Sequence, residues 1–304
     1  MERVRRALLA VVLASVGLMA CTPGSTGGTN PPPPTTTPPP PAPGEFPTPD
    51  TVGWRPTGVT LSPYTGPCVI TTDGTVIDAK DVTCTTLEVQ ADDVHITRSR
   101  IRASGDFAVR FSSGERLLIA DSEITSTTAG AADRAIALWS PDATVRSSYV
   151  HSTRRGIALG DGARIVGNYV DDLVNPSDAH TTAVSTSGGT HHVVVSGNTL
   201  GCNTQGCSSA ISIYPENWAG GPNDDIRIED NLLNGGSYCV YLGYSPDAGE
   251  LPNTNMVVVD NVFGDKYYPD CGRYGPAASW TPPPVGTGNV FSGNVDARGA
   301  PVQP

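Results

Sequence analysis

The chain has 304 residues and a formal net charge of −11, with 30 acidic and 19 basic side chains. This acidic balance disfavours nucleic acid as a partner, because binding to a phosphate backbone needs an excess of lysine and arginine. Many of the 28 prolines fall near the N-terminus, so that part of the chain cannot belong to a packed core.

The first residues have the pattern of an export signal. Arg3, Arg5 and Arg6 precede an apolar run at 7–20, which is too short to span a bilayer comfortably. The run ends in Leu-Met-Ala-Cys, which resembles the lipobox of bacterial lipoproteins, and the resemblance implies that Cys21 becomes the acylated first residue. The alternative is an ordinary secretory signal that is cleaved nearby. We therefore expect residues 1–20 to be a signal peptide and the protein to be exported, either lipid-anchored to the outer face of the cell membrane or secreted.

Residues 21–45 form a spacer in this interpretation. Ten of the 24 residues from Thr22 to Glu45 are proline, and most of the others are threonine or glycine. Such a segment buries no core and is expected to be extended and disordered. The remaining residues, 46–304, are expected to form one domain and to act as a monomer that touches the membrane only through the N-terminal lipid.

A short pattern recurs through this domain: an apolar residue, two further residues, a polar residue, one residue and another apolar one. Periods of 20–33 residues indicate a solenoid, and the short β-branched, alternating segments indicate strands. Stacked asparagine amides can donate and accept, which predicts a hydrogen-bonded ladder along the axis, with serine serving less well. Asparagine also tolerates the left-handed backbone of a tight turn. The polar residue of the pattern is Ser99, Ser122, Ser148, Asn168, Asn198, Asn231, Asn261 or Asn294.

These segments resemble the pectin-lyase-like superfamily from about Cys68 to Val295. The resemblance implies an all-β fold, a right-handed parallel β-helix of about eight coils, with three strands per coil and the asparagine turn after the second. The stretch that begins "VGWRPTGVTLSPYTGPC" resembles the N-terminal cap of secreted bacterial β-helix proteins. We therefore expect residues 46–75 to form a cap and residues 282–304 to form the C-terminal end.

Six cysteines remain after Cys21 is set aside, and an even number in an exported protein indicates disulfides. We expect the pairs Cys68–Cys84, Cys202–Cys207 and Cys239–Cys271, although the sequence alone leaves fifteen connectivities open. No C-x-x-C occurs, which disfavours a metal site built from these cysteines.

The resemblance also assigns a face to the first strand of each coil. Strand alternation then gives three outward rows of mostly small residues. A smooth floor with aromatic rings suits a flat polymer such as an extracellular polysaccharide, because rings stack on sugar C–H faces. The alternative is that long connections cover this face. The middle row is Ala137, Ala158, Ser185, Ser212 and Tyr241; the row before it is Ala135, Gly156, Ala183, Ala210 and Cys239; the row after it is Trp139, Gly160, Ser187, Tyr214 and Gly243.

Candidate site residues follow from this face. His180 lies in a long connection beside the floor, Arg155 aligns with Arg134 on a neighbouring coil, and Tyr214 and Tyr241 project from later coils. We expect His180, Arg155, Tyr214 and Tyr241 to be catalytic. The expected substrate-binding residues are Trp139, Ser185, Ser212, Glu216, Trp218, Tyr244 and Lys266. The pairs Asp92–Asp93 and Asp224–Asp225 occupy equivalent turns and are interpreted as structural.

Three functions fit such a groove. A uronate lyase needs a cation at the carboxylate, a base for the C5 proton and an acid at the leaving oxygen, and the resemblance adds Ca²⁺ as a candidate cofactor. A glycoside hydrolase needs two carboxylates, for which Glu216 and Asp178 are candidates. The third is a non-catalytic module that binds a glycan or another partner. The polygalacturonase-like and pectate-lyase motifs are absent, which weakens the case for catalysis. We rank the lyase first, the binding module second and the hydrolase third.

Overall fold

The computed structural model describes residues 45–174, 180–186, 188–203, 206–215, 221–243 and 251–304. The expected signal peptide, Cys21 and the proline-rich spacer lie outside the described residues. Internal contacts separate residues 1–39 from residues 40–304, and the second of these units contains the fold discussed below. Within the described ranges, no helix has the length and apolar character needed to cross a membrane.

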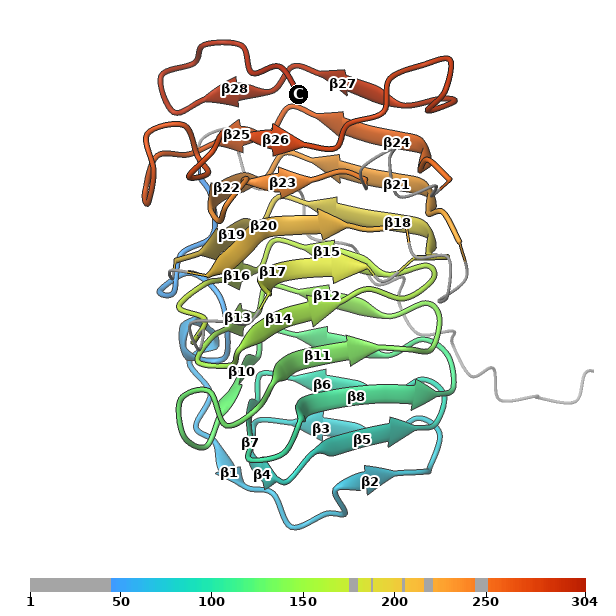
Figure 1. Cartoon of the computed structure of the whole chain (residues 1–304). Coiled ribbons are helices and arrows are strands. Elements are labelled where there is room, and N and C mark those ends of the chain that lie inside the picture. Colours follow the sequence, from blue (N-terminus) through green and yellow to red (C-terminus); the bar gives the residue numbers. More distant parts are fainter. Residues whose placement is uncertain (1–44, 175–179, 187, 204–205, 216–220, 244–250) are drawn as a thin grey trace, which may run out of the picture. The chain divides into compact units, whose positions relative to one another are not determined.

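The described part of the chain forms three parallel sheets, which Figure 1 shows as a stack of coils. The first sheet contains β2 (Val69–Ile70), β5 (Leu87–Gln90), β8 (Phe107–Ser113), β11 (Arg134–Leu138), β14 (Arg155–Ala158), β17 (Thr181–Thr186), β20 (Cys207–Ile213), β23 (Val240–Tyr241) and β26 (Ala277–Ala278). The second contains β3 (Val76–Asp78), β6 (His95–Thr97), β9 (Leu118–Ala120), β12 (Thr144–Arg146), β15 (Arg164–Val166), β18 (His191–Ser196), β21 (Asp224–Glu229), β24 (Thr254–Val259) and β27 (Val290–Ser292).

The third sheet contains β1 (Ser62–Pro63), β4 (Lys80–Cys84), β7 (Arg100–Ala103), β10 (Glu123–Ser126), β13 (Tyr149–Val150), β16 (Tyr169–Val170), β19 (Thr199–Cys202), β22 (Leu232–Gly235), β25 (Val262–Phe263) and β28 (Val295–Asp296). The chain visits the sheets in the order first, second, third, and each strand pairs with the equivalent strand of the next coil. The molecule is therefore a right-handed parallel β-helix, as predicted. Nine strands in the first and second sheets give one coil more than the expected eight.

Apolar side chains from all three sheets fill the interior. In the first sheet, Ile136, Ile157, Val184, Ile211 and Val240 are register partners from coil to coil, and all are buried. A single coil could not bury these side chains alone. The stacking of neighbouring coils is needed to form a continuous core. The predicted inward positions of the first strands are confirmed.

The asparagine ladder is present. Asn168 Nδ2 donates to Asn198 Oδ1 at 3.0 Å, and the amides of Asn198, Asn231 and Asn261 each bond the next in the same way. In the early coils, the backbone N–H of Ser99 donates to Ser122 Oγ at 3.2 Å, so serine continues the ladder with fewer bonds. One expectation was wrong. The left-handed residue is not the asparagine but the residue before it, which is Gly167, Gly197, Asp230, Asp260 or Gly293 in the later coils.

A second, shorter ladder lies at the turn between the first and second strands. Asn223 Nδ2 donates to Asn253 Oδ1 at 3.0 Å, and Asn289 Nδ2 donates to Asn253 O at 3.0 Å. Asp93 and Asp225 adopt left-handed φ values of 54° and 55° near this turn, which agrees with their interpretation as turn residues. The ladder accounts for the asparagine of the Pro-Asn pairs at two of these turns.

Replacing Asn231 by alanine should lower the free energy of unfolding by about 1–3 kcal/mol, because it leaves buried partners on both neighbouring coils without hydrogen bonds. Asn231→Ser, which installs the residue that the early coils use, should lose less. Urea denaturation of the two variants and the wild type measures this difference. Equal stability of Asn231→Ala and wild type would show that the ladder contributes nothing.

The three expected disulfides are confirmed as Cys68–Cys84, Cys202–Cys207 and Cys239–Cys271. Their Cα–Cα distances of 5.9, 5.6 and 5.5 Å lie in the ordinary range for a disulfide. Cys202–Cys207 joins the end of β19 to the start of β20, and Cys239–Cys271 joins the residue before β23 to the connection between β25 and β26. They therefore fasten the connections that border the first sheet.

Residues 45–58, which the sequence analysis assigns to an N-terminal cap, lie along the third sheet. The Thr199 hydroxyl donates to Pro47 O at 2.7 Å, and Gly53 N–H donates to Ser147 O at 2.8 Å. Figure 1 shows this segment in blue beside β13, β16 and β19. We call residues 45–58 the strap. It includes the short 3-10 turn η1 (Arg55–Thr57) and leads to β1 at the end of the stack.

The strap is fastened to a buried carboxylate on β10. Trp54 Nε1 donates to Glu123 Oε2 at 2.8 Å, Arg55 pairs with the same oxygen at 2.5 Å, and His151 Nε2 lies 3.3 Å from Oε1. Burial alone would raise the pKa of Glu123. The hydrogen bonds from His151 and Trp54 and the charge of Arg55 outweigh burial and lower this pKa to about 2.

Glu123→Gln should therefore lower the free energy of unfolding by roughly 2–3 kcal/mol at neutral pH. A depressed carboxyl pKa stabilises the fold above the ordinary glutamate value of 4.5, and this stabilisation is lost as the pH falls from 4.5 to about 2. The difference between wild type and variant should disappear over the same interval, as measured by denaturation at pH 7, 4 and 2.5. Glu115→Gln, at an exposed surface pair, is the matched control. A difference as large at pH 2.5 as at pH 7 would contradict the assignment.

Candidate functional site

The outward face of the first sheet has a narrow floor of small residues. Ala137, Ala158, Ser185, Ser212 and Tyr241 are register partners, as the sequence predicted. Ala137, Ala158 and Ser212 are buried, whereas Ser185 and Tyr241 are half-buried. The surface of this row is therefore contributed mainly by the middle and later coils. It provides a flat strip on which side chains from neighbouring rows can gather.

The row before it does not belong to the floor. Ala135, Ala183, Ala210 and Cys239 are fully buried and belong to the hydrophobic core. A Cβ added at Gly156 would come within 2.0 Å of Ala183 O and 2.9 Å of a core methyl group. This position thus faces the next coil and the interior, because the chain is still turning from the third sheet into the first. The expectation that this row is outward was wrong.

Two arginines lie side by side where the first strands begin. Arg134 and Arg155 are register partners on adjacent coils. Arg155 pairs with Asp133 at 3.4 Å and keeps a buried Nε without a hydrogen-bond partner. Among the described residues, Arg134 forms no ion pair or side-chain hydrogen bond, and its pKa is lowered by burial and by the positive charge of Arg155. Two cations with one carboxylate between them make a site that a further anion would stabilise.

An aromatic platform adjoins these cations. Trp139 is 58% exposed, and its ring centroid lies 5.1 Å from that of Phe107 in an edge-to-face arrangement. The Arg110 guanidinium lies 5.6 Å from both ring centroids and pairs with Glu88. Phe107 is also the register partner of Arg134, so the platform and the two arginines occupy three successive coils. An exposed ring that is held in place near a group of arginines is suited to a charged sugar polymer.

Tyrosines gather at the other end of the same face. The rings of Tyr214 and Tyr241 are 5.7 Å apart, Tyr238 lies 5.5 Å from Tyr241, and Tyr238 lies 6.0 Å from the largely exposed Tyr274. Burial raises the pKa of Tyr241 above its ordinary value. From the coil of Trp139 to that of Tyr241 there are four strand spacings, or about 19 Å. The face can therefore hold an extended polymer at two aromatic stations.

The structure does not bring His180 together with the two tyrosines. His180 immediately precedes β17, whereas Tyr214 immediately follows β20, and Thr186 pairs with Ile213. Their backbones are thus about 20 Å apart along the strand direction at about 3.3 Å per residue. Tyr241 pairs with Ser212, well beyond the start of the strand. These residues lie on nearby coils, as predicted, but at different positions along their strands.

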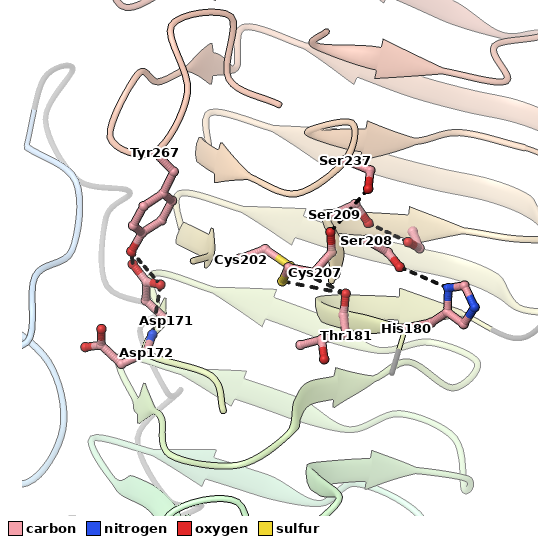
Figure 2. Close-up of a disulfide and its surroundings, with 11 residues drawn as sticks. Asp171, Asp172, His180, Thr181, Cys202, Cys207, Ser208, Ser209, Ser237 and Tyr267 are labelled. Atoms are coloured by element: carbon pink, nitrogen blue, oxygen red, sulfur yellow. Dashed lines mark hydrogen bonds between the residues drawn. A yellow bond between two sulfur atoms is a disulfide. The ribbon is translucent and has the colours of Figure 1, made fainter. Parts of the chain in front are cut away.

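His180 is instead a neighbour of Arg155. The register of β14 and β17 places Arg155 beside Thr182, two residues from His180 and one coil away. His180 is exposed, and its Nδ1 lies 3.4 Å from Ser208 Oγ on β20. Figure 2 shows this pair on one side of the Cys202–Cys207 disulfide, with Asp171 and Tyr267 on the other. The arginines and His180 therefore form one group at the edge where the first strands begin.

Lys266 does not border this groove. It lies on the third-sheet side, where its Nζ is 2.8 Å from Asp171 Oδ2 and 3.3 Å from the Tyr169 hydroxyl. Partial burial would lower the pKa of Lys266, but Asp171 outweighs burial and raises it. Tyr267 donates to the same carboxylate, which is only 1% exposed. The loop after β25 folds back over two coils to reach Asp171, so the expected groove role of Lys266 was wrong.

The remaining expected binding residues have different outcomes. Ser212 is fully buried and shares a 2.5 Å hydrogen bond with Ser209, so its side chain does not reach the surface. Trp139 and Ser185 do face outward. Glu216, Trp218 and Tyr244 lie outside the described residues, as does Asp178.

Phe107, Arg110 and Arg134 belong to the candidate site although they were not among the expected site residues. Arg134 was noted only because it aligns with Arg155. Extending the same alignment one coil toward the N-terminus would have added Phe107, its register partner. Arg110 could not have been found this way, because its role depends on how Trp139 folds back over the preceding coil.

The described residues contain no cluster of three or more His, Cys, Asp or Glu side chains that could hold a metal ion. The face therefore presents cations, hydroxyl groups and aromatic rings as its chemistry. Ca²⁺ stays a prediction from the family resemblance.

Comparisons with known proteins give fold-level similarities. No protein-family model matches the sequence, and no curated protein matches it. Among solved structures, an alginate lyase from Paenibacillus sp. str. FPU-7 is 14% identical, with 77% of this chain and 80% of that chain covered and a TM-score of 0.47. The tailspike protein of E. coli bacteriophage HK620, solved in complex with a pentasaccharide, is 14% identical, with 75% of this chain and 40% of that chain covered and a TM-score of 0.42. These similarities are too distant to carry a function over to this chain.

Proposed function

We propose that the protein binds an acidic extracellular polysaccharide along the outward face of the first sheet. The observation that carries this proposal is the arginine pair, in which Arg134 and Arg155 share a single neighbouring carboxylate. A uronate carboxylate could accept charge-assisted hydrogen bonds from both guanidinium groups and relieve their mutual repulsion. Two acidic groups of the same face, Glu88 and Asp133, each pair with an arginine.

The aromatic stations support the same substrate class. Trp139 presents its exposed ring at one end and the tyrosine group occupies the other. Sugar rings have apolar C–H faces that pack on such rings, while small residues such as Ala158 leave room for the chain between them. The sequence predicts a tether that consists of a lipid on Cys21 and a proline-rich spacer. This tether would hold the face outside the cell. Fractionation of cells that produce the full chain tests whether the protein is membrane-anchored.

Cleavage by β-elimination is the second candidate, and the position of His180 favours it. An arginine that neutralises the uronate carboxylate makes the C5 proton more acidic, and His180 would take that proton. The C5–H electrons then form the C4–C5 double bond as the C4–O bond breaks, and the leaving oxygen takes a proton from water or an acid. Tyr214 is too distant from His180 to be that acid. The candidate carboxylates of a hydrolase, Glu216 and Asp178, lie outside the described residues, so the hydrolase stays a prediction from the sequence.

One screen separates the functions. The exported protein is incubated with a panel of acidic and neutral polysaccharides, with and without EDTA and added Ca²⁺. Retardation in gels that contain a uronate polymer is the expected result. Near-ultraviolet absorbance from an unsaturated uronate identifies a lyase, and new reducing ends without that absorbance identify a hydrolase. Binding to neutral polymers alone would contradict the proposal.

A further inference from the structure

A cleft of about 480 Å³ lies on the third-sheet side of the molecule, away from the proposed groove. One wall is the strap at Phe46, and the floor is formed by Tyr169 on β16 and Leu232 on β22. The loop that carries Asp265 and Lys266 forms another wall. This volume is within the range of small-molecule sites.

The side chain of Asn234 offers an amide donor to this cleft. Asn234 is 3% exposed and lines the cleft. Its Oδ1 accepts the backbone N–H of Lys266 at 3.2 Å, and since a backbone N–H can only donate, the amide oxygen must face that group. Nδ2 therefore points the other way, and it donates to none of the described residues. An amide held in this way is a preorganised donor for an oxygen atom of a ligand.

The charges in the cleft disfavour an anion. Lys266 is the cation of the lining, but its Nζ is already paired with the buried Asp171. Asp265, which is exposed and also lines the cleft, adds a second negative charge. A carboxylate ligand would therefore meet a net negative environment, whereas a hydroxyl group can accept from Asn234 and donate to Asp265.

We propose that this cleft binds a neutral sugar ring, such as the terminal residue of a neutral glycan. Its hydroxyl groups would bond the Asn234 amide and the Asp265 carboxylate, and its C–H face would pack against Phe46 and Leu232. Because the cleft involves a different sheet from the arginine pair, this proposal does not depend on the function proposed above. The protein would then have one site for an acidic polymer and a separate site for a neutral sugar.

The test uses the neutral methyl glycosides of glucose, galactose and mannose, with free glucuronate as the anionic arm. Each is titrated into ¹⁵N-labelled mature protein, and the Asn234 side-chain amide signal is assigned by its loss in Asn234→Ala. Ala297→Trp places a large ring in the cleft from an exposed position, and Ala131→Trp adds the same ring at an exposed turn elsewhere.

At least one neutral glycoside should shift the Asn234 amide signal saturably in wild type and in Ala131→Trp. The affinity should fall at least about tenfold in Ala297→Trp, a loss of about 1.4 kcal/mol. Glucuronate should bind more weakly than the neutral ligand. No shift with any neutral glycoside, an unchanged affinity in Ala297→Trp, or tighter binding of glucuronate would each overturn the proposal.

Discussion

Replacing Arg134 and Arg155 together by glutamine is expected to weaken binding of a uronate polymer by about 10²–10³-fold. A hydrogen bond to a charged group contributes about 1.5–3 kcal/mol, and two such groups at one carboxylate together account for a loss of this size. The stability of the fold should not suffer, because the wild type holds two like charges on adjacent coils with one carboxylate beside them. Affinity electrophoresis in gels of graded polymer concentration measures the binding.

The matched control removes the same charge elsewhere. Arg116→Gln combined with Arg298→Gln alters two exposed arginines that pair with surface carboxylates. This control should bind the polymer nearly as well as wild type, apart from a small, salt-dependent change. If both double variants lose affinity equally, net charge rather than the arginine pair is responsible. If neither loses affinity, the site lies elsewhere.

His180→Ala is expected to lower the rate of polymer cleavage by about 10²–10⁴-fold, the usual scale for a general acid or base. His180 is exposed and its side chain forms one weak hydrogen bond, with Ser208, among the described residues, so the variant should fold and melt like wild type. Binding of the polymer should change little, since the arginines and the aromatic platform remain. The rate is followed by the absorbance of the unsaturated product.

His192→Ala is the control for this prediction. His192 is also exposed, but it lies on the second sheet and pairs with Asp225. It should retain full activity. A fully active His180→Ala would remove His180 from the site. An unfolded His180→Ala would show that its contact with Ser208 supports the loop.

The coil architecture could be predicted because it depends on local periodicity. The 30- and 33-residue spacings of Asn198, Asn231 and Asn261 indicate equal coils, and β-branched residues between them indicate strands. The repeat length does not show which residue of the turn adopts the left-handed conformation, because this depends on the backbone geometry of the turn. Glycine or aspartate before each asparagine was the available signal, since both accept positive φ more readily than most residues.

The site was harder to predict because it depends on where each side chain lies along the strand and on contacts between distant coils. The predicted stacking of coils aligned Arg134 with Arg155 correctly. It also grouped His180 with Tyr214, although these two residues lie at opposite ends of their strands. Lys266 reaches Asp171, 95 residues away in the sequence, because a loop folds back across the third sheet. No local pattern encodes such a contact.

The central claim is that the first-sheet face recognises the carboxylates of an acidic polysaccharide. The most direct measurement compares one uronate polymer with the same polymer after its carboxyl groups have been reduced to alcohols. The two share linkage and length, so a difference in retardation of the wild-type protein reports the carboxylates alone. We predict strong, salt-sensitive retardation by the untreated polymer and at least about tenfold weaker binding to the reduced one. Equal binding to both polymers would contradict the assignment of the arginine pair.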